Sequence, residues 1–131
     1  MENTVGLDKA LGIHDDALLL RSRRATLLAS NLANADTPNY KAQDIDFHSA
    51  LKTASKTDVS MTQTHQRHLV GAHSTEGQLQ FRHPHQPSLD GNTVETQVEQ
   101  ALFAENAVQY QASLQFVGNK FKSLSAAIKG E

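Results

Sequence analysis

The clearest pattern in the chain is a heptad repeat of apolar residues in its last third. The repeat advances in alternating steps of four and three, which is typical of a helix face that packs against another helix. We call this row the C-terminal seam; it consists of Phe103, Ala107, Tyr110, Leu114, Val117, Phe121, Leu124 and Ile128. Asn92, with Glu95 three residues later, is typical of a capping box at a helix start. The pattern predicts one long helix from just after Asn92 to Gly130, where glycine ends it.

A second amphipathic stretch occupies the first third of the chain. Its main apolar row, the N-terminal seam, contains Leu11, Leu18, Leu28 and Leu32. A neighbouring row contains Ile13, Ala17, Leu20 and Leu27. Two adjacent rows are expected of a helix that contacts more than one neighbour. The helix should run from about residue 5 to residue 34 or 35, because the residue before Pro38 avoids helical backbone angles.

The middle of the chain is much more polar than its two ends. Of the apolar residues, 17 fall in residues 1–36, 18 in residues 93–131 and only 15 in the 56 residues between them. Thr37 to Tyr40 should form a β-turn, with Pro38 second and Asn39 at positive φ third. An extended segment follows to Phe47, and residues 48–88 are interpreted as loop. Within them, Leu69-Val70 and Leu79-Gln80-Phe81 are candidate strands of a weak hairpin across residues 74–77.

These patterns together predict a mainly α protein whose long terminal helices pair as an antiparallel coiled coil. Residues 1–36 and 92–131 would form one coiled-coil assembly domain. Residues 37–91 would hold the turn, the extended segment and a polar, loop-rich insert with room for a small β-hairpin. Because both helices carry more apolar surface than one hairpin buries, we expect neighbouring subunits to cover the rest.

Composition narrows the function further. The chain has 131 residues, 38% of them hydrophobic, a net charge of −2 and no cysteine. The charge balance argues against nucleic acid as a partner. The lack of cysteine excludes disulfides and thiolate chemistry. The sequence contains no nucleophile elbow, Walker-type loop or dinucleotide fingerprint. We therefore expect no enzyme activity, no cofactor and no small-molecule substrate.

Two clusters of titratable side chains deserve a functional test. Five histidines lie between residues 65 and 85: His65, His68, His73, His83 and His85. Imidazoles can bind zinc or copper, but Pro84 interrupts the series and no carboxylate pattern completes a site, so a solvated insert is favoured and no metal is expected. Arg21, Arg23 and Arg24 form a short basic cluster, which we expect to pair with acidic residues of a neighbouring helix or subunit.

The start of the chain and its hydropathy bear on its location. No stretch reaches the roughly 18–20 apolar residues of a membrane span. The opening Met1-Glu2-Asn3 has no basic segment of the kind that begins a cleaved signal peptide. We therefore expect the protein either to remain in the cytoplasm or to leave by a route that reads no such signal.

The segment from Leu28 to Lys41 resembles the N-terminal signature of the bacterial flagellar rod and hook protein family. The signature has the pattern S-N-[LI]-A-N-x-x-T-P-G-[YF]-K, and Asn39 stands where the family usually has glycine. The matching residues are Ser30, Asn31, Leu32, Ala33, Asn34, Thr37, Pro38, Tyr40 and Lys41. Within that family the chain resembles a proximal rod protein. Three features support this: its short length, residues 86–94 before the last helix, and the ending at residues 120–130.

This resemblance implies a structural subunit of the basal body rod, the axle that transmits torque to the hook. It implies export by the flagellar type III apparatus without a cleaved signal, and a place in the periplasmic part of the rod. The implied partners are other copies of the chain, other rod proteins, and the rod–ring adaptor protein with the membrane ring. Asn31 and Asn34 are expected to fix the helix end and the turn through hydrogen bonds to backbone.

Two alternatives remain open at this point. The chain could be another proximal rod protein of the same family. It could also be a small coiled-coil adaptor or export chaperone, which would form a stable dimer and remain inside the cell.

Overall fold

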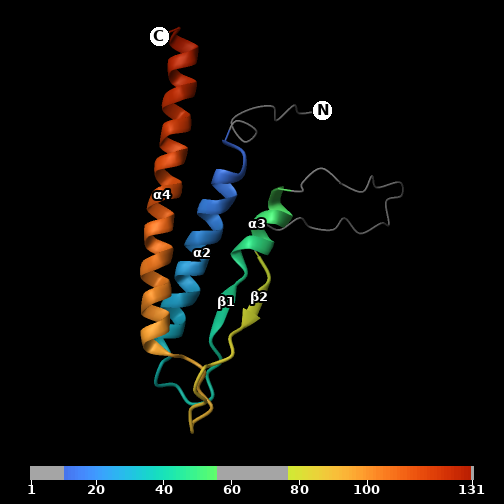
Figure 1. Cartoon of the computed structure of the whole chain (residues 1–131), viewed down its shortest axis with the longest axis vertical. Helices are drawn as coiled ribbons and strands as arrows, with labels where there is room; N and C mark the ends of the chain where they lie inside the picture. Colours follow the sequence, from blue (N-terminus) through green and yellow to red (C-terminus); the bar gives the residue numbers. More distant parts are fainter. Residues whose placement is uncertain (1–10, 56–76, 131) are drawn as a thin grey trace, which may run out of the picture.

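Helices and two short strands make up the part of the chain that the structure describes. The computed structural model describes residues 11–55 and 77–130. In chain order the elements are α2 (Ile13–Ala33), β1 (Gln43–Ile45), α3 (Phe47–Ser55), β2 (Leu79–Phe81) and α4 (Thr96–Lys129) (Figure 1). The expectation of a mainly helical fold is confirmed.

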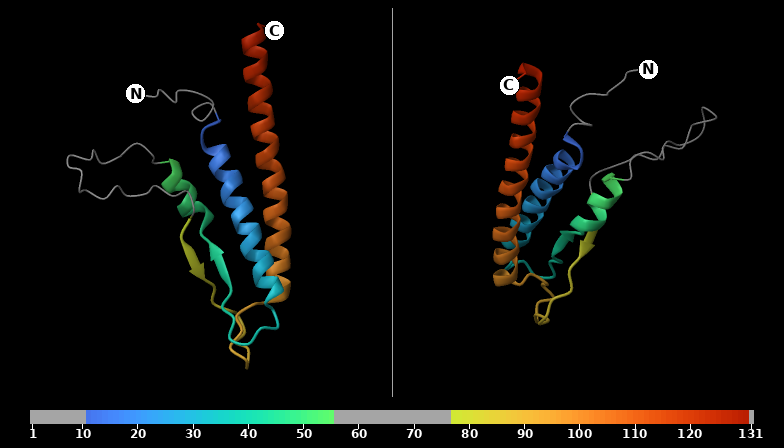
Figure 2. Two further views of the ribbon diagram at one scale, coloured as in Figure 1. Left: turned by 180° about the vertical axis from the view of Figure 1, so that it is seen from behind. Right: turned by 45° about the horizontal axis from the view of Figure 1, so that its top comes forward.

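Helix α2 lies in the middle of the molecule. Figures 1 and 2 show α4 antiparallel to α2 on one side, and the two-stranded sheet with α3 on the other. Helix α4 continues well beyond the described start of α2. The loops that join the elements at residues 34–42 and 82–95 meet at the foot of the molecule. Helix α2 therefore has neighbours on two sides, as two adjacent apolar rows predict.

The apolar core lies between α2 and the insert, not between the two long helices. Leu20, Ile45 and Ala50 are buried at its centre. Leu27, Phe47 and Leu51 pack around them and are partly buried. Fully burying a side chain of this size stabilises a fold by about 1.5–3 kcal/mol. The part of the insert at residues 45–51 is therefore integral to the folded subunit.

Helix α3 corrects the interpretation of residues 48–55 as loop. Asp46 caps its start, because one carboxylate oxygen accepts the Ser49 backbone N–H at 3.2 Å and the other accepts the Ser49 hydroxyl at 2.7 Å. The apolar side chains at 47, 50, 51 and 54 recur at helical spacing, and the first three belong to the core or pack against it. Capping together with this short apolar face explains why a generally polar segment forms a helix here.

The sheet is antiparallel and joins segments that are distant in sequence. Gln43 pairs with Phe81, Asp44 with Gln80 and Ile45 with Leu79. The predicted strand at residues 79–81 is confirmed, and its partner among the described residues is β1. Leu69-Val70 lies outside the described residues. The sheet that the structure describes is not a hairpin, because α3 and the following segment intervene between its strands.

The predicted helix ends are partly confirmed. The turn at residues 37–40 forms as expected, with Asn39 at φ 59° and the Tyr40 N–H donating to the Thr37 carbonyl at 3.3 Å. Gly130 ends α4 with φ 75°. The capping box at Asn92 was wrong, because α4 begins only at Thr96 and Glu95 precedes it without a side-chain cap. Asn92 instead binds carbonyls of the turn that follows α2.

Candidate functional site

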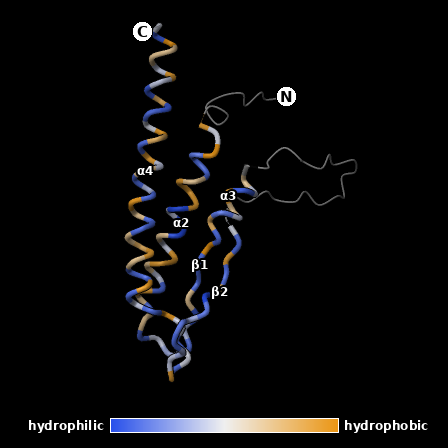
Figure 3. Tube along the Cα trace, viewed as in Figure 1, coloured by the Kyte–Doolittle hydropathy of each residue, from blue (hydrophilic) through white to orange (hydrophobic). Residues whose placement is uncertain are grey.

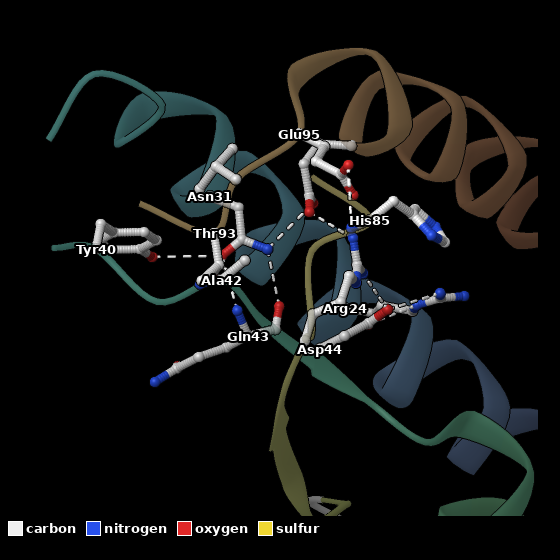
Figure 4. Close-up of polar contacts among 12 residues, drawn as sticks. Arg24, Asn31, Tyr40, Ala42, Gln43, Asp44, His85, Thr93 and Glu95 are labelled. Carbon is white, nitrogen blue, oxygen red and sulfur yellow. Dashed lines mark hydrogen bonds and ion pairs between the residues drawn. The ribbon is translucent and has the colours of Figure 1, made fainter. Parts of the chain in front are cut away.

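The signature segment ties the end of α2 to the first strand through the amide of Asn31. This side chain is 1% exposed. Its Nδ2 donates to the Gln43 carbonyl at 2.8 Å, and its Oδ1 accepts the Gln43 N–H at 3.1 Å. Figure 4 shows the amide lying against Gln43, with Tyr40 beside it. The Asn31 side chain thus makes the two backbone hydrogen bonds that a neighbouring strand would make at the outer edge of β1. The predicted binding of Asn31 to backbone is confirmed.

The remaining signature residues brace the turn that follows α2. Asn34 Nδ2 donates to the Ser30 carbonyl at 2.8 Å, and Asn34 Oδ1 accepts the Thr37 hydroxyl at 3.1 Å. The hydroxyls of Ser30 and Tyr40 lie 3.3 Å apart. Lys41 Nζ donates to the Gly91 carbonyl at 2.6 Å. Leu32 is half-buried, whereas Ala33 and Pro38 are exposed. The predicted backbone contact of Asn34 is therefore confirmed.

Asn92 joins this turn to the loop before α4. Its buried Nδ2 lies within hydrogen-bonding distance of three carbonyl oxygens, those of Asn34 (3.0 Å), Ala35 (2.8 Å) and Thr37 (2.9 Å). The carbonyls at the C-terminus of a helix have no partner within the helix. The Asn92 amide supplies a hydrogen-bond donor to these carbonyls. It thereby connects the two stretches that resemble the family, residues 30–41 and 86–94, into a single joint at the foot of the molecule.

A buried polar cluster links α2, the sheet and α4 next to this joint. Arg24 binds both carboxylate oxygens of Asp44, at 2.8 and 2.9 Å (Figure 4). Arg82, just after β2, binds Asp44 with one terminal nitrogen and Glu99 with the other. Glu99 is fully buried, and its second carboxylate oxygen accepts Asn31 Nδ2 at 3.1 Å. Both acidic groups are neutralised by arginine, as burial of a charge requires.

The charge state of Asp44 reflects competing influences. Burial alone would raise the pKa of Asp44. The hydrogen bonds from Arg24 and from the Ile45 N–H, together with the charges of Arg24 and Arg82, outweigh burial and hold that pKa below its usual value. A carboxylate with a lowered pKa in the folded state stabilises the fold at neutral pH. That contribution is lost as the pH falls from the unfolded pKa, about 3.9, through the folded pKa.

We therefore expect Asp44→Asn to lower stability at neutral pH and to weaken its dependence on acid. The measurement is urea denaturation of both proteins at about pH 7 and about pH 3. The wild-type chain should lose more free energy of unfolding on acidification than the variant. Asp36→Asn, at an exposed position, is the matched control and should follow the wild type. Equal acid losses in wild type and Asp44→Asn would contradict this role of Asp44.

The face of α4 that contacts α2 most closely is polar. Glu99, Asn106 and Ser113 recur every seven residues and are 0%, 1% and 9% exposed. Glu99 contacts Asn31, and Asn106 Nδ2 donates to the Arg21 carbonyl at 2.9 Å. We call these three residues the polar column. It lies beside the C-terminal seam on the same helix, so α4 is rotated relative to the seam-against-seam packing that the heptad pattern suggests.

The C-terminal seam is consequently left largely uncovered. Phe103 and Tyr110 are 38% and 37% exposed, Leu114 52%, Phe121 44% and Ile128 86%. Ala107 is exposed, and Val117 and Leu124 are half-buried. Figure 3 shows hydrophobic residues along all of α4, including the part that extends beyond α2. A monomer rarely exposes a contiguous apolar row of this length without a partner.

The N-terminal seam is covered better than its C-terminal counterpart. Leu28 is fully buried, and Leu11, Leu18 and Leu32 are half-buried. The neighbouring row supplies Leu20 and Leu27 to the core with the insert. The structure therefore brings the predicted seam residues of α2 into the fold, and it leaves most of those of α4 facing outward.

The structure describes the whole basic cluster but only two histidines, His83 and His85, of the histidine cluster. Arg24 pairs with an acidic residue of β1 rather than of a helix, whereas Arg21 lies over the Phe47 ring at 4.1 Å and hydrogen-bonds Gln109. His83 and His85 are exposed. Within residues 11–55 and 77–130, no three histidine, aspartate or glutamate side chains are grouped to hold a metal ion. His65, His68 and His73 lie outside the described residues.

Several of these functional residues escaped sequence reasoning. The polar column was visible as Glu99, Asn106 and Ser113 at seven-residue spacing beside the seam, but polar residues there are usually assigned to solvent. Arg82 and Asp44 gave no local signal, because their pairing joins segments 38 residues apart. Asn92 was recognised, but as a helix cap.

Comparison with known proteins agrees with this geometry. A family model described as flagella basal body rod protein matches residues 13–41, which include the signature turn. The flagellar basal body rod protein FlgB of Cereibacter sphaeroides is 47% identical, covering 96% of this chain and 98% of that protein. FlgB of Aeromonas hydrophila is 44% identical over 97% and 98% of the two chains. FlgB of Escherichia coli K12 is 44% identical over 90% and 91%.

In the described part of the chain, no helix has the length and apolarity needed to cross a lipid bilayer.

The identity of 44–47% to these FlgB proteins extends over nearly the whole of both sequences and places the chain among them. The chain therefore belongs to the FlgB family of flagellar basal body rod proteins.

Proposed function

We propose that this chain is a proximal subunit of the flagellar rod that builds the axle by packing its long helices against those of neighbouring subunits. Membership of the FlgB family makes it a structural component of the basal body rod rather than an enzyme. The observation that carries the packing mechanism is the outward C-terminal seam, in which five large apolar side chains are 37–86% exposed in the single chain.

The proposed mechanism is torque transmission through packed helices. Residues 1–36 and 92–131 would form the assembly domain, in which the terminal helices of assembled subunits pair as a coiled coil. Each large apolar side chain that becomes buried between subunits contributes about 1.5–3 kcal/mol. The signature joint supports this role, because Asn31 and Asn92 fix the helices to the insert, so that a load on one element is passed to the others.

The partners follow from the same proposal. The chain assembles with other components of the basal body. We expect these to include further copies of itself, other rod proteins, and the rod–ring adaptor with the membrane ring. We also expect delivery to the periplasmic space by the flagellar type III export apparatus, without cleavage of a signal peptide.

Deletion of the gene, complementation and fractionation test the proposal together. The deletion strain should not swim, and the complementing chain should be recovered in purified basal bodies. Pull-down from these particles should bring down other rod proteins. A chain that remains in the cytoplasm as a stable dimer, in cells that build normal basal bodies without it, would contradict the proposal.

A further inference from the structure

Two faces of α4 compete for the contact with α2. The face that makes this contact is the polar column, Glu99, Asn106 and Ser113. The first half of the C-terminal seam lies about 70° further around the helix, at about 100° per residue. This half of the seam, with Ser22 and Ala25 of α2, lines a groove of about 610 Å³. A turn of α4 about its own axis would close the groove and bury large apolar side chains, which is favourable.

The Asn106 side chain is buried although its own hydrogen bonding is incomplete. Its Nδ2 donates to the Arg21 carbonyl at 2.9 Å, whereas its Oδ1 has no partner among the described residues. The Arg21 carbonyl lies inside α2, where carbonyls accept the N–H four residues further on, so it does not require this donor. Burying a polar atom without a partner destabilises a fold. Attachment of α4 to α2 therefore does not explain an asparagine at this position.

The polar contacts of the column exist at only one rotation of α4. Glu99 binds Asn31 on α2 and Arg82, just after β2. Asn106 binds the Arg21 carbonyl. A turn that brought the seam onto α2 would carry both side chains away from these partners and leave the Glu99 carboxylate without its cation, which is strongly unfavourable. Buried polar residues between helices can fix one arrangement at a cost in stability.

We propose that Glu99 and Asn106 are positioning residues, which hold α4 in the rotation that keeps the C-terminal seam on the outside. Without them α4 turns, the seam packs on α2 and the subunit closes on itself. This inference rests on the function proposed above, because a seam buried within one subunit is lost to neighbouring subunits. The polar column is thus a device that keeps the free subunit competent to assemble.

Thiol labelling of the full chain in solution tests this role, because the natural chain has no cysteine. Ala107→Cys reports on the seam, where residue 107 is exposed, and Ser113→Cys reports on the polar column, where residue 113 is 9% exposed. With Glu99 and Asn106 present, residue 107 should react with a maleimide about tenfold faster than residue 113, since a buried thiol reacts only when the structure opens locally. In Glu99→Leu with Asn106→Leu, the order should reverse.

The double variant leaves the remaining partners of the cluster occupied. Arg82 keeps its ion pair with Asp44, and the Asn31 amide keeps its hydrogen bonds to the Gln43 backbone. The matched control is Gln97→Leu with Gln115→Leu, which adds the same two side chains at exposed α4 positions outside the column and the seam. The control should label in the same order as the chain with Glu99 and Asn106.

Each labelling result decides the matter. Reversal in the double variant, with the control unchanged, supports the positioning role. An unchanged order in the double variant would show that other contacts set the rotation, and would overturn it. Fast labelling of both residues would show that Glu99 and Asn106 attach α4 to α2 without choosing its rotation, which also overturns it. Slow labelling of both would mean that a second copy covers the seam, with the same consequence.

Purified basal bodies separate this inference from the proposed function. The double variant should be absent from basal bodies, and its cells should not swim. If its labelling order does not reverse while the wild-type chain is found in basal bodies, the positioning role is overturned and the rod function stands. Reversal in solution together with normal swimming would instead contradict the proposed function, because burial of the seam would then not prevent assembly.

Discussion

Leu114→Asp should abolish swimming while the chain is still made and exported. Leu114 lies at the middle of the C-terminal seam and is 52% exposed in the single chain. The substitution therefore costs the isolated subunit little. In the assembled rod it would replace the about 1.5–3 kcal/mol of leucine burial with a carboxylate in an apolar interface, which costs several kcal/mol more. This penalty recurs at every copy, so assembly should fail completely rather than weaken.

Swarm diameter in soft agar measures swimming, and immunoblots of cell fractions follow export of the chain. Gln115→Asp is the matched control. It introduces the same charge one residue further along α4, at an exposed position off the seam, and should leave swimming close to normal. Normal swimming of Leu114→Asp would mean that the C-terminal seam is not an assembly surface.

Arg82→Met should lower the free energy of unfolding by about 3–5 kcal/mol, the range found when one partner of a buried ion pair is removed. Glu99 is fully buried, and its carboxylate has Arg82 as its cationic partner and Asn31 as a neutral donor. Methionine keeps much of the packing volume but leaves the carboxylate without compensation. Asp44 would keep Arg24, so the loss falls mainly on the junction of α4 with the rest of the molecule.

Urea denaturation followed by circular dichroism provides the measurement. Lys122→Met, an exposed cation on α4, is the control and should change the stability by no more than about 0.5 kcal/mol. Glu99→Gln should cost less than Arg82→Met, because Arg82 still binds Asp44 and no buried charge is left unpaired. If Arg82→Met behaved like the control, the polar cluster would not contribute to stability.

Predictions that depend on neighbouring residues in the sequence were largely correct. The turn at Thr37–Tyr40 formed with Asn39 at positive φ, and Gly130 ended α4. Asn31 and Asn34 bind backbone as expected. Backbone preferences and side-chain hydrogen bonds over a few residues act within the segment itself. Helix α3 was missed although Asp46 and the spacing of Phe47, Ala50 and Leu51 were visible, because the surrounding segment is polar.

The sequence by itself determined that two long amphipathic helices flank a polar insert, and that a family signature lies at the end of the first. Only the tertiary structure decided which face of α4 meets α2. The heptad pattern records that the seam is apolar, but not what covers it. Glu99 and Asn106 face α2 because Asn31 and the Arg21 carbonyl on α2 bind them, and Arg82, just after β2, pairs with Glu99. These partners are distant from α4 in sequence. A buried charge must meet its partner, whereas an apolar row can be covered by any apolar surface, so the seam is left for a neighbouring subunit.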